Sequence, residues 1–366
     1  MLDGLFAAHW PAPIPVTPSP ITWHYRNKVD FNFGRRRYEE KPPPDFVRET
    51  VLGFNQKGRW YSILDLEECL IGPEGMDRLL EAVRAWYRRE DLHAWDEKTG
   101  EGMLRGLLVR EGKRTDERMV AIVTRGGDFP AQSFVDCVLG VSNAASVQRA
   151  IHNGPSQGVF AESLEVLHGA PHIHEELRVA GAPKPLRYRI SPLSFFQTNT
   201  LATEVLYGEI RRWVKGIAPT VLYDLYGGAG GIAMTVSDLV PVARSVENVE
   251  SASLDGEHNV AANAIGNVFF TTADIKDYVS GIADQGGMER GSAAIVDPPR
   301  AGMHPKAIKR LLACRPPDLL YVSCNPTLFA RELPEFLRAY TLTDLRAVDL
   351  FPHTPHVELL ASMRLR

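Results

Sequence analysis

After Pro192 the sequence alternates between strand-like and helix-like segments, and this alternation restricts the possible folds more than any other feature. Apolar runs of strand length, such as 220–226 and 318–324, are each followed by apolar residues at helical spacing. Strand and helix alternating this many times is typical of a doubly wound, mainly parallel sheet. We therefore predict an α/β domain over residues 191–366, in which ligands bind beyond the carboxyl ends of the strands.

The preceding residues follow a different pattern. Apolar and polar residues alternate in three short segments, which favours antiparallel strands: 28–33, 104–110 and 119–125. Apolar residues at helical spacing predict one clear helix over 76–89. We expect residues 21–190 to form a smaller α+β domain, so that the 366 residues divide into two domains, each with its own core.

Residues 1–20 are rich in proline, and we interpret them as a poorly ordered arm. This segment lacks the basic flank and the apolar stretch of a signal peptide. No segment approaches the roughly 20 apolar residues that a membrane span needs. Four scattered cysteines form no C-x-x-C pair, which favours a reduced compartment. We expect a cytoplasmic monomer that contacts no membrane.

A glycine-rich turn follows the strand predicted at 220–226. Residues 228–233 fit the pattern G-x-G-x-x-A, in which glycine permits positive φ and a close approach of a ligand to the backbone. Glu247 lies at the end of the next predicted strand, where a carboxylate can accept hydrogen bonds from both hydroxyls of a ribose. A tight turn beside a surface glutamate is the alternative. Together the strand, turn, helix and acid predict a nucleoside cofactor, either NAD or S-adenosylmethionine.

Cys324 lies where an apolar strand ends and a helix beginning with proline follows. We expect it at the ligand edge of the sheet, where the helix N-terminus favours its thiolate. A second strand ends at the same edge with Asp297, two prolines and Arg300. Most free cysteines are small buried apolar residues, and we interpret the other three in this way: Cys69, Cys137 and Cys314.

The sequence resembles the RNA uracil-C5 methyltransferase family, which contains the bacterial tRNA and 23S rRNA 5-methyluridine enzymes. The resemblance covers the chain from about residue 20 onward. It is carried by YRNKVDF (25–31), FFQTN (195–199), DLYGGAGG (224–231), Glu247, DPPRAG (297–302), SCNPTLFAREL (323–333) and DLFPHTPHVE (349–358). It implies a Rossmann-like class I methyltransferase domain with S-adenosylmethionine as its cofactor.

The resemblance also implies a reaction, the transfer of a methyl group to carbon 5 of a uridine in RNA. Carbon 5 of uracil is a poor nucleophile, but a thiolate that adds to carbon 6 converts the ring into an enolate that can attack the methyl group. By resemblance Cys324 is this thiolate, and Glu358 is the base that removes the proton from carbon 5. Without the resemblance, Glu358 would be interpreted as a surface residue.

By the same resemblance, seven residues line the pocket for the cofactor and the base: Gln197, Tyr226, Gly228, Gly231, Glu247, Asp274 and Asp297. Asp297 would contact the uracil ring or place the cofactor, although a turn residue ahead of two prolines is the alternative. The chain departs from the family at Gly227, where Cys is usual, and at Gly231, where Asn is common. A side-chain contact at position 231 is therefore lost.

The RNA must present its uridine unstacked or flipped out. The net charge of −4 gives no general attraction to phosphate, so RNA contact requires a local basic region. The candidate contacts are Arg26, Lys28, Arg35 and Arg36, with Arg37, Arg105, Arg110, Lys113 and Arg114 as further candidates. A solvated basic face is the alternative. We favour rRNA over tRNA as the substrate.

We expect no metal site and no iron–sulfur cluster. Relatives that bind an iron–sulfur cluster carry three grouped cysteines that this chain lacks. Cys69 lies about where their fourth cysteine ligand is expected, but a single thiolate cannot hold such a cluster. The histidines at 172, 174, 353 and 356 are interpreted as structural.

Two other functions fit part of the sequence. An NAD-dependent oxidoreductase with a nucleophilic thiolate would use the glycine turn and Glu247, but it leaves the ending FPHTPHVE unexplained. A non-catalytic RNA-binding homologue would explain Gly227 and Gly231, although both residues needed for the chemistry are retained. An amino-group methyltransferase is disfavoured, because Arg300 stands where such enzymes carry an aromatic residue.

Overall fold

The computed structural model describes residues 2–36, 48–56, 58–155 and 161–366, and it contains two compact units. Unit 1 comprises Met1–Thr22, Glu176–Tyr188 and Ser194–Arg366, and unit 2 comprises Trp23–Glu175 and Arg189–Leu193. The segments 1–22 and 176–188 thus belong to unit 1, which differs from the predicted division at residues 20 and 190.

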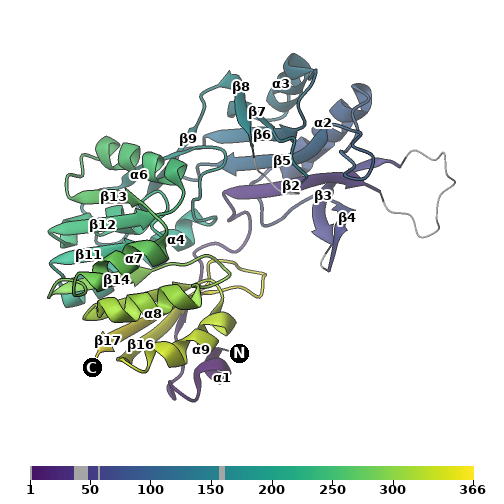
Figure 1. Cartoon of the computed structure of the whole chain (residues 1–366). Helices are drawn as coiled ribbons and strands as arrows, with labels where there is room; N and C mark the ends of the chain where they lie inside the picture. Colours follow the sequence, from purple (N-terminus) through teal and green to yellow (C-terminus); the bar gives the residue numbers. More distant parts are fainter. Residues whose placement is uncertain (1, 37–47, 57, 156–160) are drawn as a thin grey trace. The chain divides into compact units, whose positions relative to one another are not determined.

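Unit 1 is built on an eight-stranded sheet with the order β1-β16-β17-β15-β14-β11-β12-β13 (Figure 1). Its strands are β1 (Val16–Thr17), β11 (Val221–Leu225), β12 (Val242–Glu247), β13 (Val268–Thr272), β14 (Ser292–Val296), β15 (Asp318–Ser323), β16 (Tyr340–Val348) and β17 (Glu358–Leu365). All neighbouring strands are parallel except β17, which is antiparallel to both β15 and β16. The predicted mainly parallel, doubly wound sheet is therefore confirmed.

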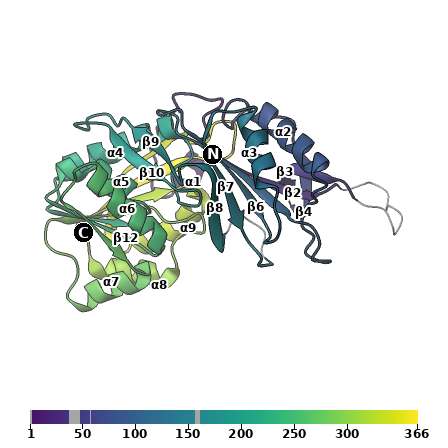
Figure 2. The ribbon, with the colours of Figure 1, turned by 90° about the horizontal axis from the view of Figure 1, so that it is seen from above.

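Helices cover both faces of this sheet (Figures 1 and 2). One face carries α1 (Leu2–Phe6), α7 (Ile275–Asp284), α8 (Pro305–Cys314) and α9 (Pro326–Phe336), whose apolar side chains form one core with the strands. The other face carries α4 (Thr200–Ile217), α5 (Gly231–Thr235) and α6 (Glu250–Ala262). Cys314 lies in the first core and is 1% exposed, as expected for a structural cysteine.

The proline-rich N-terminus is part of unit 1, so the prediction of a poorly ordered arm is wrong. Phe6 is fully buried, and its ring lies 6.0 Å from the ring of Phe329. The amide of Ile14 donates to Asp3 at 2.9 Å, and β1 pairs with β16. Burial of these apolar side chains orders the segment despite its prolines.

Unit 2 contains a seven-stranded sheet with the order β4-β3-β2-β5-β6-β7-β8. Its elements are β2 (Lys28–Arg35), β3 (Thr50–Gln56), β4 (Arg59–Asp65), α2 (Met76–Arg89), β5 (Leu104–Glu111), β6 (Arg118–Thr124), α3 (Ala131–Leu139), β7 (Ala144–Ile151) and β8 (Ser163–Gly169). Its strand pairs are antiparallel apart from β6 and β7. The predicted helix over 76–89 is α2, and its buried Trp86 packs near Phe134 of α3.

Two further strands, β9 (Ile173–Leu177) and β10 (Leu186–Ile190), form a separate two-stranded sheet. Among the described residues, no helix is long and apolar enough to cross a membrane.

Candidate active site

Five strands of unit 1 bring the predicted site residues to one edge of the sheet. Leu225 pairs with Val246 on one side and with Val296 on the other, so the residues that follow β11 and β14 lie beside the end of β12. Parallel neighbours end at the same edge. The residues at these ends are Tyr226, Glu247 and Asp297, and Cys324 follows β15.

Glu358 reaches the same edge from the opposite direction. It is the first residue of β17, the strand that runs antiparallel to β15. Ser323 pairs with Leu359, so one further step along this register brings Cys324 opposite Glu358. The two residues with predicted catalytic roles therefore lie near each other, and the charge of Glu358 helps to raise the pKa of the Cys324 thiol, although 33 residues separate them in the chain.

The glycine turn leaves β11 through residues with positive φ: Tyr226 (65°), Gly228 (54°) and Gly230 (79°). This conformation turns the backbone amides toward the end of β12. The amide of Gly228 donates to one carboxylate oxygen of Glu247 at 3.0 Å, and the amide of Val249 donates to the other at 2.9 Å. Glu247 is therefore held beside the turn, in the place expected for an acid that accepts hydrogen bonds from a ribose.

A pocket lies around this turn. Its lining includes five of the predicted residues: Gln197, Tyr226, Gly228, Gly231 and Asp297. Four aromatic residues also contribute to the lining, and sequence reasoning did not identify them as pocket residues: Tyr188, Phe195, Phe196 and Tyr207.

Two predicted residues, Glu247 and Asp274, lie beside this lining. Asp274 is the N-cap of α7 and accepts the amide of Asp277 at 3.1 Å. Burial, followed by the charge of Asp274, raises the pKa of Tyr226 to about 12, with a smaller contribution from Glu247. Both acids are therefore close enough to Tyr226 to act on it electrostatically.

Cys324 is half-buried in an adjoining small pocket with Pro298, Pro299, Arg300 and Asn325. Burial, and then the charges of Glu358 and Asp297, raise the pKa of the thiol to about 11, while Arg300 acts in the opposite direction. Burial and the two nearby acids therefore act against the thiolate, so the effect of the helix N-terminus on this thiol stays a prediction.

Several acids are buried at this edge of the sheet. Burial raises the pKa of Asp224 to about 7, and burial together with Asp297 raises that of Glu358 well above its usual value. One carboxylate oxygen of each of Asp224 and Glu358 has no hydrogen-bond partner in the described residues. S-adenosylmethionine carries a sulfonium and an ammonium, whereas NAD carries an anionic pyrophosphate. The acids therefore fit the methyl donor better than the dinucleotide.

Local packing explains both departures from the family pattern. A Cβ atom on Gly227 would collide with the hydroxyl oxygen of Ser245, so a larger residue there requires the Ser245 side chain to move. A Cβ atom on Gly231 would lie 2.5 Å from the hydroxyl oxygen of Tyr207. Asp224, which sequence reasoning missed, lies beneath the turn and accepts the amide of Ala233 at 3.0 Å. The sequence feature that could have identified Asp224 is an acidic residue within an otherwise apolar strand.

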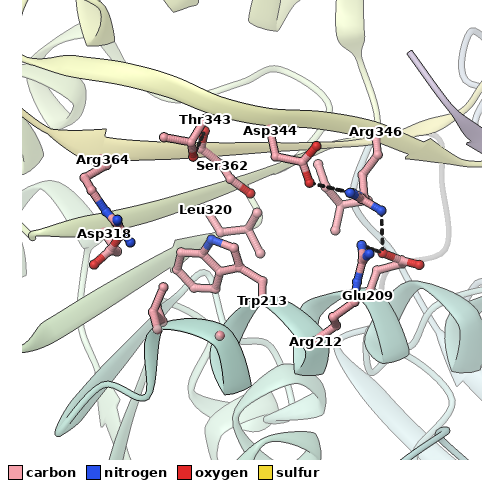
Figure 3. A pocket seen from close by; sticks show the side chains of 13 residues that line it. Glu209, Arg212, Trp213, Asp318, Leu320, Thr343, Asp344, Arg346, Ser362 and Arg364 are labelled. Atoms are coloured by element: carbon pink, nitrogen blue, oxygen red, sulfur yellow. Dashed lines mark hydrogen bonds and ion pairs between the residues drawn. The ribbon is translucent and has the colours of Figure 1, made fainter. Parts of the chain in front are cut away.

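A third pocket of unit 1 lies between α4 and the sheet, at the opposite end of β15 and β17 (Figure 3). Its acids are each paired with an arginine: Asp318 with Arg364, Glu209 with Arg212 and Arg346, and Asp344 with Arg346. It contains none of the predicted site residues.

Three of the four predicted RNA contacts in unit 2 have acidic partners. Lys28 pairs with Asp30 at 2.8 Å, Arg35 with Asp96 at 3.2 Å, and Arg36 with both Glu49 and Asp65. Such part-exposed pairs are worth about 0–1 kcal/mol, so phosphate can compete for the cation. The half-buried Arg26 donates its amide to the carbonyl of Ile71.

Three further candidate RNA contacts are not exposed basic residues of this kind or are not described by the structure. Arg105 and Arg110 are buried and donate to carbonyl oxygens, which makes them structural residues rather than phosphate contacts. Arg37 lies outside the described residues. In the part of the chain that the structure describes, no group of three or more His, Cys, Asp or Glu residues could hold a metal ion.

Comparison with known proteins agrees with this site. The family model described as tRNA (Uracil-5-)-methyltransferase matches residues 161–363. An uncharacterized RNA methyltransferase of Caldanaerobacter subterraneus is 32% identical over 347 residues, which cover 93% of this chain and 73% of that protein. A tRNA (uracil(54)-C(5))-methyltransferase of Pyrococcus furiosus is 31% identical over 352 residues, which cover 96% of this chain and 76% of that protein.

The fold leads to the same family. The crystal structure of Pyrococcus abyssi tRNA (uracil-54, C5)-methyltransferase in complex with S-adenosyl-L-homocysteine matches with a TM-score of 0.74 and 28% identity. The match covers 99% of this chain and 81% of that one. The chain therefore belongs to the tRNA (uracil-5-)-methyltransferase family, and it is an S-adenosylmethionine-dependent enzyme that methylates carbon 5 of uracil in RNA.

Proposed function

We propose that Cys324 is the nucleophile that adds to carbon 6 of the target uridine, and that Glu358 removes the proton from carbon 5. The observation that carries this proposal is the register of β15 and β17, which sets Cys324 opposite a buried Glu358. A nucleophile and a base on neighbouring strands can act on adjacent atoms of one ring.

The bonds change in a defined order. Sγ of Cys324 loses its proton to solvent water and bonds to carbon 6 as the thiolate, and the electron pair of the 5,6 double bond moves into the ring as an enolate. When bound, S-adenosylmethionine supplies an electrophilic methyl group to carbon 5. Glu358 then takes the proton from carbon 5, the double bond re-forms, and Sγ leaves carbon 6. Because its pKa is raised, an ionised Glu358 is a stronger base than an exposed glutamate.

The residues around the glycine turn would hold the cofactor in this proposal: Gln197, Tyr226, Gly228, Gly231, Glu247, Asp274 and Asp297. Glu247 suits the ribose because the amides of Gly228 and Val249 fix both of its oxygens in place. Asp297 lies in the lining of the turn pocket and acts electrostatically on Cys324, so it can serve either the cofactor or the base.

The RNA contact is assigned to unit 2 in this proposal, through Arg26, Lys28, Arg35 and Arg36, and the enzyme is assigned as a monomer. The family resemblance leads us to favour rRNA as the substrate, whereas the Pyrococcus relatives are named for uridine 54 of tRNA. Both RNA classes therefore belong in the assay.

The test is methyl transfer from labelled S-adenosylmethionine to rRNA and tRNA from a strain that lacks 5-methyluridine. We expect the wild type to label one class, Cys324→Ala to label neither, and Cys137→Ala to match the wild type. Cys137 is a suitable control because burial also raises its pKa to about 11, and it lies on α3 of unit 2.

Full activity of Cys324→Ala would disprove the covalent mechanism. Cofactor binding by the wild type without any labelling of RNA would instead support the non-catalytic RNA-binding homologue.

A further inference from the structure

Tyr207 lies on α4 and contributes to the lining of the turn pocket, together with Gly228, Gly231 and Asp297. Its side chain is buried, with 6% of its surface exposed. A tyrosine at helical spacing on an amphipathic helix is ordinarily a core residue. Tyr207 differs because its polar end lies at a ligand pocket.

The hydroxyl of Tyr207 lies against the first residue of α5. A Cβ atom on Gly231 would be 2.5 Å from this hydroxyl oxygen and 3.3 Å from the ring carbon that bears it. Glycine at position 231 therefore leaves the space that the hydroxyl occupies. The hydroxyl of Tyr207 therefore occupies the space in which a side chain at position 231 would make its contact.

This hydroxyl has no hydrogen-bond partner among the residues that the structure describes, whereas the neighbouring Tyr188 donates to the carbonyl of Gly231 at 3.4 Å. Buried hydroxyls are normally satisfied, because an unmade hydrogen bond costs free energy. Burial, and then nearby charges, raise the pKa of Tyr207 well above its usual value, so the group stays protonated and can donate. A ligand bound in the pocket can therefore accept a hydrogen bond from it.

The surroundings indicate which part of the cofactor supplies that acceptor. Glu247, assigned to the ribose, is not among the groups that act on Tyr207, whereas Asp224, Asp297 and Glu358 are. Tyr207 is also absent from the pocket that holds Cys324, where the base is expected. With the ribose assigned to Glu247, the carboxylate of the amino-acid portion is the strongest hydrogen-bond acceptor that remains on the cofactor.

We propose that the hydroxyl of Tyr207 donates a hydrogen bond to the carboxylate of the amino-acid portion of S-adenosylmethionine, from the space that a side chain at position 231 would fill. This inference rests on the same cofactor as the proposed function, but it does not depend on the covalent chemistry of Cys324.

Calorimetric binding of two ligands to the full chain tests it. S-adenosylhomocysteine has the amino-acid portion, and 5′-methylthioadenosine lacks it. In Tyr207→Phe we expect the Kd of S-adenosylhomocysteine to rise by about tenfold or more, as for a hydrogen bond to a charged group, with the Kd of 5′-methylthioadenosine unchanged. Tyr340→Phe is the matched control, since its buried hydroxyl donates to the carbonyl of Pro316 instead.

The inference is overturned if Tyr207→Phe binds both ligands normally, or if both affinities fall equally. It is also overturned if only the formation of the RNA adduct changes, since the hydroxyl would then serve the base. A failure of the proposed function gives a different result from a failure of this inference. In that case S-adenosylhomocysteine still binds normally, and only the Cys324 adduct is absent.

A second pair of variants tests the placement of the hydroxyl by thermal unfolding. We expect Gly231→Ala to lower the Tm of the wild type, because its Cβ atom meets the hydroxyl of Tyr207. In the Tyr207→Phe background the same change should lower the Tm less. An equal loss in both backgrounds would contradict the placement.

Discussion

The acidic residues at the two ends of β15 and β17 differ in their surroundings. In the pocket of Figure 3, at the end that carries Asp318 and Arg364, every acid has an arginine partner. At the other end, Glu358 and Asp224 are buried, and each has an oxygen without a hydrogen-bond partner in the described residues. Paired, part-exposed charges contribute little beyond local structure. Unpaired buried acids are costly, and their presence indicates a site shaped for a ligand.

The largest expected effect contrasts Glu358→Gln with Glu209→Gln. Glutamine keeps the shape of Glu358 but cannot take the proton from carbon 5, so we expect the methylation rate to fall on the order of 10²–10⁴-fold. A covalent protein–RNA adduct should accumulate and appear as a slow band on a denaturing gel. Glu209→Gln, in the pocket with paired charges, should stay within about twofold of the wild type, because loss of a surface ion pair costs little.

A rate of Glu358→Gln equal to that of the wild type would remove the functional difference between the two ends. A slow Glu358→Gln without an adduct would instead assign the residue to an earlier step.

The next effect concerns stability. The pKa of Asp224 is about 7 in the folded protein and about 3.9 in an unfolded chain, so the stability it contributes is present below about pH 4 and is lost as the pH rises through 7. We therefore expect Asp224→Asn to gain on the order of 3 kcal/mol relative to the wild type between pH 5 and pH 8.5. Urea unfolding at both pH values measures this gain.

The control for this comparison is Asp318→Asn, which loses its ion pair with Arg364 and should show no comparable gain at high pH. A gain of the same size in Asp318→Asn would show that the two ends do not differ.

A third effect concerns the reactivity of Cys324. Because the thiol has a pKa of about 11, its thiolate fraction rises about tenfold for each pH unit below that value. Alkylation by iodoacetamide in the absence of ligands should therefore accelerate about 100-fold from pH 7 to pH 9, without a plateau. Mass spectrometry of the labelled peptide gives the rate. A plateau near pH 7 would show that the helix N-terminus dominates after all.

The smallest effect is expected from Arg346→Ala, which removes the partner of Glu209 and Asp344. These side chains are part-exposed, so the free energy of unfolding should fall by about 1 kcal/mol or less. Urea unfolding at low and high salt would show that loss shrink as salt screens the charges. A loss above about 3 kcal/mol would mean that this end depends on its charges as strongly as a buried ion pair does.

Much of the fold could be predicted from periodicity. The helix over 76–89 and the strands around 221–225 and 318–323 occur where the pattern of apolar residues indicated them. The N-terminal segment could not be predicted in this way, because its order depends on burial of Phe6 and on pairing of β1 with β16. Both are contacts with residues more than 300 positions away in the chain.

For the candidate site, the residues at strand ends were within reach of sequence reasoning, whereas Tyr207 was not. Parallel strands end at one edge, so the position of Cys324 after an apolar strand was enough to place it there. Tyr207 has the spacing of a core residue, and only the packing of α4 against the turn brings its hydroxyl to the pocket. The pKa of Cys324 was also out of reach, because it depends on burial and on acids from other strands.

By itself, the sequence determined the order of strands and helices, the glycine turn after β11 and the position of Cys324 beyond β15, because local periodicity and turn chemistry decide these features. The tertiary structure alone decided that Glu358 lies near Cys324. That proximity depends on β17 running antiparallel between β15 and β16, which brings the first residue of one strand beside the last residues of the other. Strand direction and order come from packing across the whole sheet, which no local pattern encodes.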